Sequence, residues 1–129
     1  VEALKKVATP EGTAAGAALT NYIVAGKTGT AQKVVNGTYA ADKFISSFIG
    51  FFPADNPELC ISVVLDEPKN GYYGGQAAAP AFKRIAEAAA NYLNIRPEKS
   101  LQPADADAPI VGTDPAPIRT VAARGLANR

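Results

Sequence analysis

The sequence predicts an α/β fold of the α+β type, in which an antiparallel sheet meander is covered on one face by a C-terminal helix. Three stretches, 22–35, 44–52 and 59–65, are rich in β-branched and aromatic residues and are separated by short turns. Successive strands joined by short turns pair in antiparallel fashion. A longer stretch, 76–93, repeats apolar residues with the period of a helix. This helix is therefore expected to lie across the sheet.

The strands end at recognisable turns. Asn36-Gly37 is a strong hairpin signal after the first strand, because both turn positions need a positive φ. The proline-containing segment 53–57 predicts the second turn. The stretch 44–52 carries apolar residues at both odd and even positions, which predicts a central strand covered on both faces. Cys60 lies in an apolar run of the third strand, so we expect it to be a buried filler.

Helical segments are predicted before and after the strands along the chain. A helix end around residues 4–7 should stop before Thr9-Pro10, because the residue before proline avoids the helical region. Thr13 is expected to cap a short helix over 14–19. In the long C-terminal helix, Pro80 fits only in the first turn, where the missing amide would have been unpaired. The stripe of that helix that faces the core is predicted to be Phe82, Ile85, Ala86, Ala89 and Leu93.

Composition excludes several classes of function. Lys and Arg number 13 against 12 Asp and Glu, with both signs mixed, which argues against nucleic acid as the main partner. The chain contains no histidine, so a histidine-based triad or metal site is excluded within it, and no metal or other cofactor is implied. It also lacks methionine and begins at Val1, so we expect a piece of a longer protein whose N-terminal part is missing.

The segment densest in chemically active residues is Ala25-Gly26-Lys27-Thr28-Gly29-Thr30-Ala31-Gln32, inside the first predicted strand. A nucleotide-binding phosphate loop would need glycine at position 21, where Asn21 stands, and a helix after the motif, where two valines follow instead. Lys-Thr-Gly is an element of penicillin-binding proteins and serine β-lactamases. A glycine inside a strand usually marks the close approach of a ligand or another backbone, and the flanking hydroxyls can donate to an anion.

Two further segments agree with this second interpretation, namely Phe48-Ile49-Gly50-Phe51-Phe52-Pro53 and Tyr72-Tyr73-Gly74-Gly75 ahead of Ala79-Pro80-Ala81-Phe82. In order and spacing, residues 1–95 resemble the last third of the transpeptidase domain of a class B penicillin-binding protein of the division type. The resemblance implies a D,D-transpeptidase that cross-links peptidoglycan stem peptides through a serine acyl-enzyme and is blocked by β-lactam antibiotics. It also implies a membrane anchor in the missing N-terminal part, this domain in the periplasm or outside the cell, and partners in the division machinery.

The resemblance implies roles for the motif residues. Lys27 would complete a proton and hydrogen-bond network with serines of the missing part, since no Ser-x-x-Lys or Ser-x-Asn occurs in this chain, which alone is expected to be inactive. The hydroxyls of Thr28 and Thr30 would bind the substrate carboxylate, and Gly29 would leave room for the ligand. The main-chain N–H of Thr30 would donate to the oxyanion. The expected catalytic residues are Lys27 and Thr30, and the expected substrate-binding residues are Lys27, Thr28, Gly29, Thr30, Tyr72, Tyr73 and Gly74.

The period of two in a strand places Thr28 and Thr30 on one face and Lys27 on the other. All three can serve one cleft only if that cleft runs along the edge of the strand. Two other functions remain open. A serine β-lactamase or D,D-carboxypeptidase of the same superfamily shares Lys-Thr-Gly, and the upstream sequence would decide. A non-catalytic cell-wall-binding fragment would carry a vestigial motif and would not bind labelled penicillin.

The composition changes near residue 97, after which prolines recur among Asp and Ala. Such composition is typical of a linker or a disordered tail. A strand-like segment, 109–112, followed by a helix start at Asp114-Pro115 faintly resembles the opening of a PASTA peptidoglycan-binding module. We therefore expect the C-terminal portion of a transpeptidase domain at 1–96 and a linker and tail at 97–129.

Overall fold

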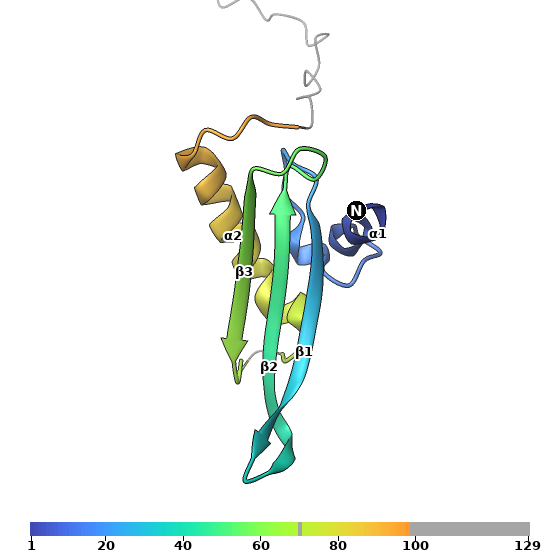
Figure 1. Ribbon diagram of the computed structural model, residues 1–129, viewed down its shortest axis with the longest axis vertical. Coiled ribbons are helices and arrows are strands. Elements are labelled where there is room, and N and C mark those ends of the chain that lie inside the picture. The colour runs from blue at the N-terminus through green and yellow to red at the C-terminus, as the bar shows by residue number, and fades with distance from the viewer. Residues whose placement is uncertain (70, 99–129) are drawn as a thin grey trace, which may run out of the picture.

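The predicted α+β architecture of an antiparallel meander and a covering C-terminal helix is confirmed. The computed structural model describes residues 1–69 and 71–98. In chain order the elements are α1 (Glu2–Lys5), the 3-10 turns η1 (Lys6–Ala8) and η2 (Ala15–Ala17), β1 (Ala25–Val35), β2 (Thr38–Phe52), β3 (Leu59–Asp66) and α2 (Gly74–Tyr92). Figure 1 shows α2 lying across one face of the sheet, with the N-terminal helical segments beside β1.

The sheet has the order β1-β2-β3, and both pairs are antiparallel. Asn36 (φ 52°) and Gly37 (φ 81°) form the predicted tight turn between β1 and β2. β2 begins at Thr38, six residues earlier than predicted, because it pairs with β1 immediately after this turn. β3 reaches only to the level of Ile45, so the far end of the hairpin extends beyond it as a two-stranded ribbon.

One face of the sheet is covered by α2 and the other is open among the described residues. The cross-strand rows under α2 are Gly26-Gly50-Ile61, Thr28-Phe48-Val63 and Thr30-Ser46-Leu65. On the opposite face, Ile49 and Val64 are exposed. The prediction that the second strand is covered on both faces is therefore wrong for the part of the chain that the structure describes, because α2 shields only one of the two sets of alternating side chains.

Cys60 corrects a second expectation. It was expected to be buried, but it is exposed on the open face, opposite Phe51 of β2. β3 alternates regularly, with Ile61 and Val63 turned toward the helix side and Ser62 turned away. An almost continuous apolar run does not reveal which alternate set is buried, since that depends on the face against which the helix packs.

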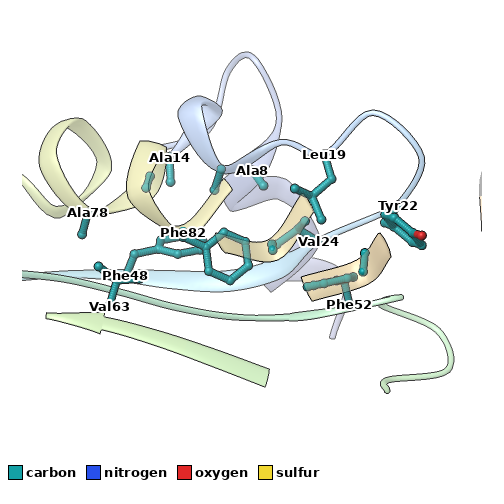
Figure 2. Packing of buried hydrophobic residues seen from close by; sticks show 14 of the residues in the cluster. Ala8, Ala14, Leu19, Tyr22, Val24, Phe48, Phe52, Val63, Ala78 and Phe82 are labelled. Atoms are coloured by element: carbon teal, nitrogen blue, oxygen red, sulfur yellow. The ribbon is translucent and has the colours of Figure 1, made fainter. Parts of the chain in front are cut away.

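The core lies between α2 and the helix-facing rows of the sheet (Figure 2). Phe82 of α2 is fully buried and meets Phe48 edge-on, with 4.8 Å between ring centroids. Phe82 also contacts Phe52, which in turn packs against Tyr22 ahead of β1. Burial of such large apolar groups supplies most of the favourable free energy of folding.

α2 turns a different stripe to the core from the one that was predicted. Phe82 and Ala86 are buried as expected, whereas Ile85 is 49% and Leu93 is 52% exposed. The buried residues are Gly74, Ala78, Ala79, Phe82, Ala86 and Ala90. Most of these are spaced four apart and, apart from Phe82, are small, so the helix backbone comes close to the sheet, while Ile85 points away from it.

The positions of Pro80 and Thr13 also differ from expectation. The helix starts at Gly74, so Pro80 is its seventh residue and lies beyond the first turn, where it cannot donate to the carbonyl of Gln76. The helix predicted over 14–19 is a single 3-10 turn without a side-chain cap. The Thr13 hydroxyl instead lies 3.5 Å from the hydroxyl of Thr28.

The described chain ends by returning to the start of β1. The N–H of Glu98 donates to the carbonyl of Asn21 (3.1 Å), and its carboxylate accepts the N–H of Ile23 (2.9 Å). The predicted tail and the PASTA-like segment lie outside the described residues from position 99 onward. Within the described residues, no helix has the length and hydrophobicity needed to cross a bilayer.

Candidate active site

The Lys-Thr-Gly-Thr motif lies on β1, which has a strand partner on one side only among the described residues. Thr28 and Thr30 share the helix-facing side of the strand, opposite Phe48 and Ser46, as their spacing predicted. Lys27 belongs to the other face, is exposed, and its Nζ donates to the carbonyl of Thr28 at 2.8 Å. β1 is an edge strand among the described residues, which a cleft served by both faces requires, but Lys27 does not line the groove that the two threonines share.

The threonines line a groove of about 310 Å³ at the N-terminus of α2. Its walls are formed by Thr13, Thr28, Thr30, Tyr73, Gly74, Gly75 and Gln76. The Oγ1 atom of Thr30 accepts a hydrogen bond from the N–H of Gly74 at 3.1 Å. The groove therefore joins the motif to the 72–74 segment, two parts of the candidate site that are more than forty positions apart.

The electrostatics of this groove favour an anion. The first amides of a helix carry a partial positive charge and have no partners within the helix. α2 is 19 residues long and has no acidic residue in its first turn, and no carboxylate lines the groove. A carboxylate bound here would meet helix dipole and hydroxyl donors together, the arrangement that binds anions in many proteins.

Tyr72 and Tyr73 form an exposed aromatic surface beside the groove. Tyr72 stacks on Phe44 of β2 with 4.3 Å between ring centroids and an interplanar angle of 18°. The rings of the two tyrosines are 4.4 Å apart, and the Tyr72 hydroxyl donates to that of Tyr73. This hydrogen bond raises the pKa of Tyr72, because it stabilises the protonated phenol, and repulsion from a Tyr73 anion and partial desolvation act in the same direction.

Gly74 allows the helix to sit directly on the strand, and Gly29 allows the Ser47 side chain to pack against the other face of that strand. A Cβ at Gly74 would lie 2.2 Å from the carbonyl oxygen of Ser47 and 2.5 Å from that of Gly29, both backbone atoms. A Cβ at Gly29 would lie 2.4 Å from the Ser47 hydroxyl. The space beside Gly29 on that face is thus filled by Ser47, so internal packing accounts for this glycine without a ligand.

Sequence reasoning missed Ser46 and Thr13, which both contact the site. A two-residue turn at Asn36-Gly37, followed strictly, would pair Ser46 with Lys27. An irregularity in the register between Gln32 and Val34 pairs Ser46 with Thr30 instead. No signal in the sequence marks this irregularity, which increases local twist and is decided by packing. Among the described residues, no group of three or more His, Cys, Asp or Glu side chains could hold a metal ion.

Comparisons with known proteins identify the family of the chain. The model of the penicillin binding protein transpeptidase domain matches residues 1–87. The probable peptidoglycan D,D-transpeptidase PenA of Neisseria meningitidis is 47% identical over 104 residues, which are 80% of this chain and 18% of that protein. The chain thus spans about a fifth of the length of this curated relative.

Solved structures of penicillin-binding proteins contain the same fold. The transpeptidase domain of penicillin-binding protein 3 from Burkholderia pseudomallei has a TM-score of 0.66 and 39% identity, covering 74% of this chain and 29% of that one. Penicillin-binding protein 3 from Mycobacterium tuberculosis, complexed with ampicillin, has a TM-score of 0.65 and 32% identity, covering 78% of this chain and 24% of that one. The chain belongs to the penicillin-binding-protein transpeptidase domain family.

Proposed function

We propose that this chain forms the Lys-Thr-Gly-Thr wall of the active site of a peptidoglycan D,D-transpeptidase, whose serine nucleophile lies elsewhere in the full-length polypeptide. One observation carries the proposal. The hydroxyls of Thr28 and Thr30 share one face of an edge strand, at a groove with the N-terminus of α2 and without carboxylates. The name of the PenA relative and the ampicillin complex of a structural neighbour support the same reaction class.

The ligands in this proposal are peptidoglycan stem peptides and β-lactams, both of which carry a carboxylate. The hydroxyls of Thr28 and Thr30 donate hydrogen bonds to this carboxylate. A hydrogen bond to a charged group contributes about 1.5–3 kcal/mol. The exposed ring of Tyr73 lines the groove, and that of Tyr72 lies next to it, so both offer apolar surface to the rest of the ligand. Gly74 keeps the helix N-terminus close to that carboxylate.

In the same proposal, Lys27 acts from the free edge of β1. Its ammonium group completes the hydrogen-bond network that moves a proton to and from the serine nucleophile. The main-chain N–H of Thr30 donates to the oxyanion that forms when the serine attacks the carbonyl carbon of the substrate. Because peptidoglycan lies outside the cytoplasmic membrane, we place this domain on that side of the membrane, anchored through the rest of the polypeptide and working with division-machinery proteins.

The test compares the full-length protein with its Thr30→Val and Lys27→Ala variants in the second-order rate of acylation by a fluorescent penicillin. Thr30→Val keeps the β-branched shape and the backbone N–H, so acylation should slow by roughly ten- to a hundredfold. The substitution also removes the acceptor of the buried Gly74 N–H, so thermal unfolding is measured in parallel to show that each variant is folded in the acylation assay. Lys27→Ala should slow it further, because a charge and a proton-transfer partner are lost. Thr20→Val, the same change at an exposed position outside the groove, is the control. Unchanged acylation in both site variants would mean that the strand is only structural.

A further inference from the structure

Apart from Tyr22, whose hydroxyl donates to the carbonyl of Ile95, Ser46 is the only buried side chain with a polar group in the part of the chain that the structure describes. It lies in the central strand between Thr30 and Leu65, on the helix-facing side. Its hydroxyl donates to the carbonyl oxygen of Tyr72. A hydroxyl buried without a hydrogen bond is costly, whereas alanine at this position would carry no such cost. The one interaction that distinguishes serine from alanine here is therefore the bond to Tyr72.

That bond holds a short segment, Tyr72, Tyr73 and Gly74, which we call the tyrosine segment. Phe44 stacks on the ring of Tyr72 and supports the same residue from a second direction. Two residues after the Tyr72 carbonyl, the N–H of Gly74 donates to Oγ1 of Thr30. Fixing the Tyr72 carbonyl therefore restricts where the Gly74 N–H can lie.

The Gly74 N–H determines where the donor hydrogen of the Thr30 hydroxyl points. A threonine hydroxyl has one donor hydrogen and two acceptor lone pairs. With one lone pair occupied by the Gly74 N–H, the hydroxyl hydrogen is left for an outside acceptor. If the tyrosine segment shifts, this bond is lost, and the Thr30 hydroxyl is free to turn its hydrogen elsewhere.

We propose that Ser46 is a positioning residue, which orients the hydroxyl of Thr30 for an anionic ligand by holding the tyrosine segment. The inference rests on the proposed function, because it assumes that Thr30 donates to the carboxylate of a β-lactam or stem peptide. It goes beyond that function by assigning a role to a buried residue that does not line the groove.

The experiment is a double-mutant cycle on the full-length protein, with fluorescent penicillin as the probe and thermal unfolding measured in parallel. Ser46→Ala should slow second-order acylation by roughly three- to tenfold, the usual size for one hydrogen bond. In the Thr30→Val background the same substitution should change the rate less than twofold, since the group it positions is gone. Ser62→Ala, on the open face of β3, is the matched control and should leave the acylation rate unchanged in both the wild-type and the Thr30→Val background.

Each outcome has a definite meaning. If Thr30→Val slows acylation but Ser46→Ala has no effect, or slows it equally in both backgrounds, the positioning role is wrong and the proposed function stands. If Thr30→Val itself has no effect, the positioning role is wrong, and Lys27→Ala then decides the proposed function: slower acylation in that variant leaves the function standing, and unchanged acylation overturns it as well. Should Ser46→Ala fail to fold, Phe44→Leu loosens the tyrosine segment through its stacking partner and must reproduce the same background-dependent slowing.

Discussion

Gly74→Ala should reveal whether the N-terminus of α2 must sit directly on the motif strand. The added Cβ would lie 2.2 Å from the carbonyl oxygen of Ser47 and 2.5 Å from that of Gly29, where ordinary contact begins at 3.4 Å. Backbone atoms of two paired strands cannot yield easily, so the helix end must retreat by roughly 1 Å. That movement stretches the 3.1 Å bond to Thr30 Oγ1 beyond hydrogen-bonding range.

Overpacking of this kind costs about 1–3 kcal/mol in the free energy of unfolding. The lost hydrogen bond should slow acylation of the full-length protein roughly three- to tenfold. The assay is the second-order acylation rate beside denaturant unfolding for each variant. Gly16→Ala is the matched control, because the atoms nearest its new Cβ all belong to Pro80 and begin at 3.3 Å, about 1 Å farther than those at Gly74. Wild-type acylation and stability in Gly74→Ala would refute the close contact between helix and strand.

The core and the hairpin give two further predictions. Phe48→Ala should lower the free energy of unfolding by about 3–5 kcal/mol, since the ring is fully buried, whereas Ile49→Ala on the open face should cost far less; equal losses in chemical denaturation would contradict the assignment of faces. Lys33 contacts Asp66 and Glu67 at 2.7 Å each, which lowers the pKa of Glu67 and raises that of Lys33. This cluster therefore stabilises the folded state fully between pH values of about 4.5 and 10.5, the ordinary pKa values of the two groups. Its contribution to stability is lost as the pH falls through the lowered pKa of Glu67, and as the pH rises through the raised pKa of Lys33. Protection from amide exchange in residues 31–43, the two-stranded end of the hairpin, should therefore fall at low and at high pH. In Lys33→Met this protection should be low at every pH. A pH profile of exchange that is the same in wild type and Lys33→Met would show that the ion-pair cluster does not stabilise the hairpin end.

The sequence by itself determined the features that depend on neighbouring residues. Asn36-Gly37 specified the hairpin turn, because few other residue pairs adopt two positive φ values. The motif was correctly assigned to a strand, with Thr28 and Thr30 on one face, because alternation is a property of the extended backbone itself. The existence of the long helix followed in the same way from its apolar period.

Only the tertiary structure decided how these elements meet. The register irregularity near Gln32 moved Ser46 from the level of Lys27 to that of Thr30. The small residues along α2 let its backbone approach the sheet and left Ile85 outside the core. Cys60 faced outward for the related reason that α2 selected the other set of side chains in β3. Each outcome depends on contacts between residues far apart in the chain, and packing complementarity of that kind is not encoded in any local pattern.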